Sequence, residues 1–251
     1  MTVPANYIPA PQSLAGRIVV VVGATGGLGR ATALASAGAG ATVVLLSRRV
    51  RALEQVYDEI TEIGAPQPAI YPLNLEGASP KDYSDLGSRI RDELGGLDAV
   101  AFTAARFDGL MPLASIDPEV WLSQIHVNLS APFLMTQSLL PLLAERPDAA
   151  IAFALDDPAR IRRAHWSGYG VAKAATEGLF SILAEEHHEG PVRIHAVRPA
   201  PMRTALRRLA YFGELVDAQP APDAAGAALA WLLSGAGAAL RSRVLDLSSE
   251  A

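Results

Sequence analysis

The sequence predicts a single Rossmann-type α/β domain, in which a doubly wound parallel sheet of about seven strands carries helices on both faces. Three observations lead to this fold class. Short apolar runs alternate with helical patterns along the 251 residues. A glycine-rich turn directly follows the first apolar run. The chain contains no internal repeat or interdomain linker, so we expect one domain at 14–251 after an N-terminal tail at 1–13.

Strands are expected where apolar runs are too continuous for a sheet with one polar face. RIVVVV at 17–22 is such a run, and it suits a parallel strand that is buried on both faces. The later segments of this character are, in order, ATVVLL (41–46), PAIYPL (68–73), LDAVAF (97–102), AAIAFAL (149–155), VRIHAV (192–197) and RVLDL (243–247).

Helical patterns fill the intervals between these strands. They lie at 27–38, 49–63, 80–94, 118–143, 168–188 and 223–233. Five glycines lie close to helix ends, where glycine costs little: Gly38, Gly40, Gly64, Gly95 and Gly190. The alternation implies right-handed crossovers between parallel strands. Residues 200–222 fit neither pattern, and long insertions of this kind often form lids over active sites.

Composition excludes several function classes. The net charge of −5 argues against a nucleic-acid partner or an anionic membrane surface. The absence of cysteine excludes disulfides and thiol nucleophiles, and the five histidines have no metal-ligand spacing, so no metal site is expected. The N-terminal segment lacks a signal-peptide pattern, and no stretch has the apolar density of a membrane span. We therefore expect a cytoplasmic protein without a membrane segment.

The glycine-rich turn predicts a cradle for a dinucleotide. The stretch VGATGGLGR at 22–30 lies between the first strand and the first helix. Glycines let backbone N–H groups approach a pyrophosphate, and the helix N-terminus adds partial positive charge. The alternative is a tight turn without a ligand, but the strand–turn–helix context favours the cradle. Its residues are Gly23, Thr25, Gly26, Gly27, Leu28 and Gly29.

The end of the second strand predicts which dinucleotide binds. Ser47 stands where a carboxylate would hold the ribose hydroxyls of NAD(H), and Arg48 and Arg49 follow it. Guanidinium groups offer planar donors to a 2′-phosphate. We therefore expect NADP(H) in preference to NAD(H), although one of the arginines could simply be solvated at the helix start.

Tyr169 and Lys173 predict acid–base chemistry. A spacing of four residues places both side chains on one helical face. Tyrosine has an ordinary pKa near 10, and a neighbouring ammonium favours phenolate and lowers that pKa. Such a phenol can donate a proton to the alkoxide that forms when hydride reaches a carbonyl carbon.

Together, these motifs resemble the short-chain dehydrogenase/reductase superfamily from about Leu14 to Leu247. Gly23, Gly27 and Gly29 match its cradle, and Tyr169 and Lys173 match its Tyr-x-x-x-Lys pair. The segment HWSGYGVAKAATEG is most similar to the YciK-like subgroup. The resemblance implies reduction of a small-molecule carbonyl or oxidation of an alcohol, in a homodimer or homotetramer paired through the long helices.

The resemblance also implies roles for single residues. Asn128 corresponds to the asparagine that positions a proton-relaying water, and Lys173 would also hold the nicotinamide ribose. The cofactor site implied in addition to the cradle consists of Ser47, Arg48, Arg49, Asn74, Leu75, Ala104, Tyr169, Lys173, Pro199, Met202 and Thr204.

The sequence departs from the family pattern at three places. The Asn-Asn-Ala-Gly motif reads FTAA (102–105), the adenine-contacting aspartate is Asn74, and the catalytic serine is Asp156. The serine would donate a hydrogen bond to the substrate carbonyl, and an ionised carboxylate cannot donate. A like charge 4 Å from the developing anion costs about 4 kcal/mol at an effective dielectric of about 20.

Three arrangements of Asp156 are possible. It could stay protonated and donate like the serine. It could turn away and pair with Arg160, Arg162 or Arg163, which is the arrangement we expect, with weak or narrow activity. In the third case the protein would bind NADP(H) but catalyse little reduction, as a non-catalytic sensor or scaffold would. The arginines at 160–163 are expected to be solvated, although with those at 203–208 they could instead attract an anionic substrate.

Overall fold

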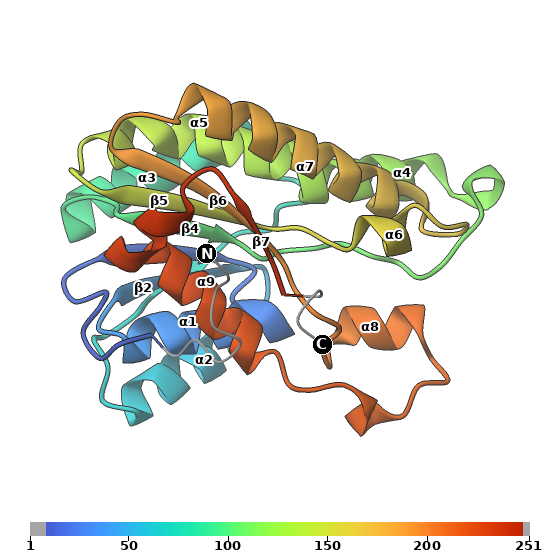
Figure 1. Ribbon diagram of the computed structural model, residues 1–251, viewed down its shortest axis with the longest axis horizontal. Coiled ribbons are helices and arrows are strands. Elements are labelled where there is room, and N and C mark those ends of the chain that lie inside the picture. The colour runs from blue at the N-terminus through green and yellow to red at the C-terminus, as the bar shows by residue number, and fades with distance from the viewer. Residues whose placement is uncertain (1–8, 248–251) are drawn as a thin grey trace.

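The computed structural model describes residues 9–247, and within them seven strands form one parallel sheet (Figure 1). The strand order is β3-β2-β1-β4-β5-β6-β7, which confirms the predicted fold class. The strands are β1 (Ile18–Val22), β2 (Thr42–Ser47), β3 (Ala69–Pro72), β4 (Ala99–Phe102), β5 (Ala149–Ala154), β6 (Val192–Arg198) and β7 (Val244–Asp246).

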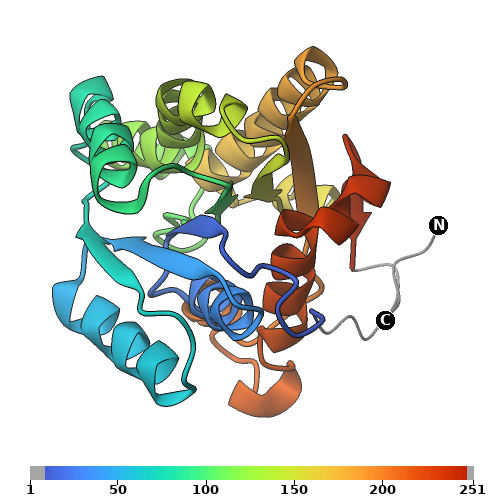
Figure 2. The ribbon, with the colours of Figure 1, turned by 90° about the vertical axis from the view of Figure 1, so that its left-hand side faces the viewer.

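Helices cover both faces of this sheet, as Figure 1 and the perpendicular view of Figure 2 show. One layer holds α1 (Gly27–Gly38), α2 (Val50–Glu62) and α9 (Asp223–Leu233). The other layer holds α3 (Pro80–Leu94), α4 (Pro118–Ile125), α5 (Ala131–Ala144) and α7 (Ser167–Glu186). Short helices α6 (Pro158–Ile161) and α8 (Ala205–Ala210) lie beyond the strand ends.

The sheet divides the interior into two apolar cores because successive side chains of a strand point to opposite faces. Val19 and Val21 pack with α1, α2 and α9, whereas Val20 and Val22 pack with the α3–α7 layer. All five residues of β1 are buried. The continuous apolar runs in the sequence follow directly from this two-sided burial.

The strand order creates a switch point between β1 and β4. The chain proceeds from β1 outward to β3 and then returns to the other side of β1 with β4, so their crossovers lie on opposite faces. Ligands of open α/β sheets bind at the carboxyl ends of the strands at such a point. Here these ends lead into Gly23 and Thr103.

One helical stretch, Pro118–Ala144, is long and apolar enough to cross a membrane by length and composition alone. It joins α4 to α5 through a π-helical turn at His126–Ser130. Half of its most apolar window is buried inside the fold, and core helices of proteins without membrane segments pass the same test.

Two sequence expectations concern irregular segments. Of the expected tail, residues 1–8 lie outside the described residues, and residues 9–13 lead into turns before Leu14, which is fully buried. The expected insertion at 200–222 is partly helical, because it contains α8 and a 3₁₀ turn at Val216–Ala218. Figure 1 shows α8 projecting at the same end of the sheet as α6.

Candidate active site

The glycine-rich turn closes onto the end of β4. Gly23 has φ +90°, and a Cβ there would lie 2.6 Å from the backbone nitrogen of Ala104. A Cβ on Gly29 would lie 2.0 Å from the carbonyl oxygen of Gly23. Side chains at either position would force the turn apart, so the glycines are required by close backbone approach.

The N-terminus of α1 fits a phosphate group. Gly26 precedes the helix without any side-chain cap, and the first turn contains no acidic residue. The first N–H groups of a helix have no intrahelical partners and carry partial positive charge, which favours an anion. A pyrophosphate therefore fits the cradle formed by this turn and helix.

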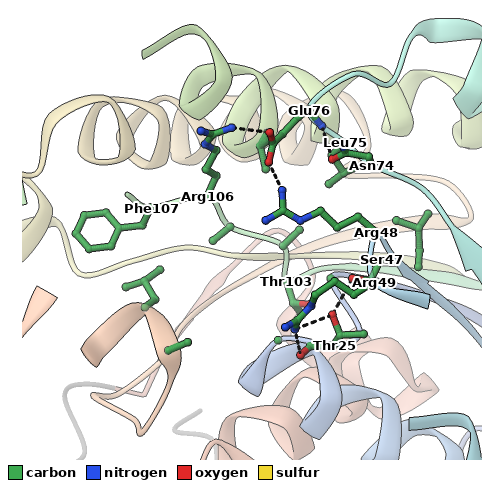
Figure 3. Close-up of a pocket in the computed structure, with 18 of the residues that line it drawn as sticks. Thr25, Ser47, Arg48, Arg49, Asn74, Leu75, Glu76, Thr103, Arg106 and Phe107 are labelled. Atoms are coloured by element: carbon green, nitrogen blue, oxygen red, sulfur yellow. Dashed lines mark hydrogen bonds and ion pairs between the residues drawn. The ribbon is translucent and has the colours of Figure 1, made fainter. Parts of the chain in front are cut away.

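A cleft of about 510 Å³ opens beside the cradle (Figure 3). The sequence-predicted cofactor residues that line it are Gly23, Thr25, Gly26, Ser47, Arg48, Arg49, Asn74, Leu75 and Ala104. The sequence-predicted residues that do not line it are Gly27, Leu28, Gly29, Tyr169, Lys173, Pro199, Met202 and Thr204. The cleft therefore brings together the adenosine half of the predicted site and leaves its catalytic half outside.

The second group of predicted residues has structural contacts instead. Leu28 is buried in the core between the sheet and α9, and Met202 packs against the same core. The hydroxyl of Thr204 accepts a hydrogen bond from the Arg207 backbone N–H (3.2 Å) and so caps α8. The Thr204 methyl group lies 3.1 Å from the place where a Cβ on Gly27 would be. These contacts attach α8 to the cradle.

The end of β2 presents two guanidinium groups to the cleft. Arg49 donates from Nη2 to the carbonyl oxygen (3.1 Å) and the hydroxyl (3.3 Å) of Thr25. The Thr25 hydroxyl lies 2.7 Å from that of Ser47. Arg48 pairs with Glu76 on the segment after β3. Figure 3 shows Arg48 reaching toward Glu76 and Arg49 reaching toward Thr25.

The catalytic half of the site is centred on the buried carboxylate of Asp156. Tyr169 Oη donates to Asp156 Oδ2 over 2.6 Å. Asp156 Oδ1 accepts from Arg160 and from the backbone N–H of Asp157 (2.7 Å). Both oxygens of Asp156 therefore have hydrogen-bond partners, as a buried carboxylate requires.

This geometry corrects the expected arrangement of Asp156. The ion pair with Arg160 is present, but the carboxylate does not turn away from Tyr169. It bridges the two side chains. The expectation failed because a carboxylate has two oxygens and can serve a phenol and a guanidinium at once. Arg160 is also not a solvated loop residue, since its guanidinium stacks 5.3 Å from the ring centroid of Trp166.

Burial decides the protonation of the catalytic pair. The pKa of Tyr169 is raised well above 10, first by burial and then by the charge of Asp156 and the hydrogen bond to it. Burial lowers the pKa of Lys173 to about 8, although the charge of Asp156 opposes this shift. The expected lowering of the Tyr169 pKa by Lys173 is therefore wrong, and the positive charge that opposes the rise comes from Arg160.

Lys173 and Asn128 are held by backbone groups. Lys173 Nζ donates to the carbonyl oxygen of Ala154 over 2.8 Å. Asn128 lies in the π-helical turn, and its Nδ2 donates to the carbonyl oxygens of Gln124 (2.8 Å) and Arg106 (2.9 Å). Its Oδ1 accepts from the backbone N–H of Arg106 (3.1 Å). Asn128 thus fastens the loop after β4, and its predicted part in a proton relay stays a prediction.

Phe107 separates Tyr169 from the open cleft. Its ring stacks on Trp166 at 5.3 Å and meets the Tyr169 ring edge-on at 5.2 Å between centroids. Leu206 and Ala210 of α8 join this aromatic cluster. Tyr169 is consequently only 2% exposed. A substrate can therefore reach the phenol only if a side chain of this cluster moves.

Sequence reasoning missed several residues of the site. Phe107 carries no sequence signal, because an aromatic residue in a loop is usually a packing residue. Glu76 and Arg106 lie shortly after the ends of β3 and β4. Ligand-binding residues of open α/β sheets often follow the carboxyl ends of strands, so this location could have indicated both residues. The π-helical turn around Asn128 belongs to a class that is frequent at functional sites, but it leaves no mark in the sequence.

The sequence profile of the short chain dehydrogenase family matches residues 17–211. The chain belongs to this family. The match runs from the first strand to the end of α8, so it includes the cradle and the Tyr169–Lys173 pair.

Individual short-chain dehydrogenases are similar over almost the whole chain. The oxidoreductase YciK of Escherichia coli (strain K12) is 35% identical over 206 residues, which cover 82% of this chain and 81% of YciK. The YciK-like resemblance is thereby confirmed. A structure from Pseudomonas syringae has a TM-score of 0.91 at 38% identity and covers 96% of this chain and 98% of its own. A structure from Escherichia coli CFT073, complexed with NADPH, has a TM-score of 0.89 at 33% identity and covers 95% and 99%.

The lowered pKa of Lys173 predicts a stability change with pH. Between pH 8 and 10 the unfolded chain keeps the lysine proton that the folded chain has lost, so stability rises with pH in this window. Relative to Lys173→Met, the wild type should gain about 1–2 kcal/mol of unfolding free energy from pH 8 to 10. Urea unfolding of both proteins measures this, and a gap that stays constant with pH would contradict the buried lysine.

Proposed function

We propose that the protein is an NADP(H)-dependent oxidoreductase that reduces a ketone or aldehyde or oxidises the corresponding alcohol. The observation that carries the proposal is the buried Tyr169–Lys173 pair at the position that the short-chain dehydrogenase family uses for catalysis. A bound nicotinamide would supply or accept the hydride. Arg48 and Arg49 at the end of β2, with no carboxylate at position 47, support the phosphorylated cofactor. The similar structures complexed with NADP and NADPH support the same choice.

In this proposal the cradle and the arginines hold opposite ends of the adenosine half. The N-terminus of α1 would take the pyrophosphate, and Arg49 would take the 2′-phosphate beside Thr25 and Ser47. Asn74 would accept from the adenine amine through its side-chain oxygen. The ammonium group of Lys173 on α7 reaches the end of β5, where it donates to the carbonyl oxygen of Ala154. Lys173 would hold the nicotinamide ribose once its ammonium group leaves this carbonyl oxygen.

Tyr169 would exchange the substrate proton together with Asp156. The phenol is neutral at neutral pH, because burial and Asp156 raise its pKa. In alcohol oxidation, the substrate hydroxyl would give its proton to Tyr169 Oη while the phenol proton passes to Asp156 Oδ2. In carbonyl reduction the same protons would have to move in reverse, which needs a proton on Asp156 at the start, so the charged carboxylate paired with Arg160 would hinder this direction. Arg160 stabilises the charged carboxylate in this relay and orients it toward the phenol.

A second function class is favoured by one specific observation. Tyr169 is 2% exposed beneath Phe107, and its hydroxyl proton is directed to Asp156 instead of the cleft. A protein that binds NADP(H) and senses or scaffolds without turnover would tolerate this closure. The two functions differ in a single measurable property, which is turnover after the cofactor has bound.

A turnover screen decides between the two functions. The wild type is incubated with NADPH and a panel of ketones and aldehydes, and with NADP⁺ and the matching alcohols, and absorbance at 340 nm is followed. Tyr169→Phe should lower turnover by at least about 100-fold, the usual size of general acid–base catalysis, and leave NADPH affinity within about threefold. Tight NADPH binding without turnover by the wild type would instead support the sensor.

Replacing the carboxylate tests its effect on the reaction. Asp156→Ser restores a hydroxyl donor toward the substrate carbonyl, so carbonyl reduction should rise by up to about 100-fold, the value of one such donor. The matched control is Asp157→Ser, because Asp157 is the adjacent carboxylate and only caps α6. A reduction rate that does not rise, or falls, in Asp156→Ser would show that the carboxylate does not hinder carbonyl reduction.

We also propose a cytoplasmic homodimer or homotetramer. Exposed apolar side chains on one helical layer support pairing between subunits: Leu122 of α4 (65% exposed), Phe133 of α5 (45%) and Ile182 of α7 (60%). The exposure of Leu122 and Phe133 would explain why only half of the most apolar window in Pro118–Ala144 is buried within one chain. Light scattering should give a mass of two or four chains, and the double variant Leu122→Asp/Ile182→Asp should lower it. A single-chain mass for the wild type would refute the assembly.

A further inference from the structure

Glu76 lies in the cofactor cleft between two arginines. Its Oε2 pairs with Arg106 Nη1 over 2.7 Å, and its Oε1 pairs with Arg48. Figure 3 shows the carboxylate placed between the two guanidinium groups, with Arg48 reaching toward it from the end of β2. All three residues line the cleft. Arg48, which with Arg49 would face a 2′-phosphate, is therefore already paired with an anion of the protein itself.

We propose that Glu76 is an internal competitor for the 2′-phosphate, and that it sets how strongly the protein prefers NADP(H) to NAD(H). The inference rests on the proposed cofactor function. A carboxylate and a phosphate seek the same N–H groups of a guanidinium. When the phosphate binds, Arg48 must leave Glu76 or share its donors, and the affinity for the phosphorylated cofactor falls accordingly.

The contacts indicate that Arg48 moves and Glu76 stays. The Arg48 side chain is 59% exposed, whereas those of Arg106 and Glu76 are 23% and 30% exposed. Arg106 is fixed further by Asp108, whose Oδ2 accepts from its Nε over 3.0 Å, and by the hydroxyl of Ser123. Arg106 thus anchors the carboxylate of Glu76 at the cleft. Arg48 must therefore break its ion pair with Glu76 when it turns toward a phosphate.

The two arginines consequently contribute unequally. Arg49 donates to the neutral Thr25, and in the ion pairs formed within residues 9–247 it has no carboxylate partner. Arg48 has its charge offset by Glu76. By Coulomb's law, freeing the guanidinium charge of Arg48 next to a dianion in a wet cleft should change the affinity by about tenfold. NAD(H) lacks the 2′-phosphate, so its affinity should change little.

Titration calorimetry of Glu76→Gln with NADPH and with NADH tests the proposal. The ratio of the NADH dissociation constant to the NADPH dissociation constant should rise about tenfold, mainly through tighter NADPH binding. In an Arg48→Gln background, Glu76→Gln should lose most of this gain, because the competition acts through Arg48. Glu76→Ala serves as a second variant, with circular dichroism to verify that both fold.

The matched control is Asp108→Asn. Asp108 is a carboxylate that lines the same cleft and pairs with Arg106, but not with Arg48. Its removal should change the ratio by less than about twofold. A ratio that stays within twofold of wild type in folded Glu76→Gln would overturn the inference while the proposed cofactor stands. A wild type that binds neither dinucleotide would overturn both.

Discussion

The hydrogen bonds to the buried carboxylate of Asp156 are the constraint on which the catalytic end of the molecule depends. A buried carboxylate is costly unless it is paired and fully hydrogen-bonded. Arg160, Tyr169 and the backbone of Asp157 together meet this need. The guanidinium in turn stacks on Trp166, which packs against Phe107. Through Arg160, the charge of Asp156 is thereby linked to the aromatic side chains that pack around the phenol.

The same carboxylate reverses the hydrogen-bond polarity of the site. A serine at this position would offer a proton to a substrate oxygen, whereas Asp156 takes the proton of Tyr169. The phenol then presents lone pairs to whatever approaches it. This polarity suits a reacting group that brings its own hydrogen, such as an alcohol, more readily than a carbonyl. Closure by Phe107 and α8 adds a second constraint, because the phenol must be uncovered before any reaction.

The predicted cofactor end differs from the buried end in its exposure to solvent. It is an open, wet cleft in which long charged side chains form ion pairs at strand ends. Parallel strands bring the residues after β1, β2, β3 and β4 to one edge of the sheet, although they are far apart in the chain. Exposed ion pairs of this kind can exchange partners at little cost, since each contributes only about 0–1 kcal/mol. The ion pairs of the cleft can therefore rearrange when a phosphate binds.

The sequence by itself determined the seven strands, the main helices, the glycine cradle and the family. These features are local: hydrophobic period, glycine in a strand–helix turn and a four-residue spacing on one helix each depend on neighbours in the chain. Only the tertiary structure decided that Asp156 bridges Tyr169 and Arg160, that Glu76 offsets Arg48, and that Phe107 covers the phenol. Partners of this kind come from different strand ends and loops, and side-chain reach and burial select among several arginines and carboxylates that the sequence offers equally.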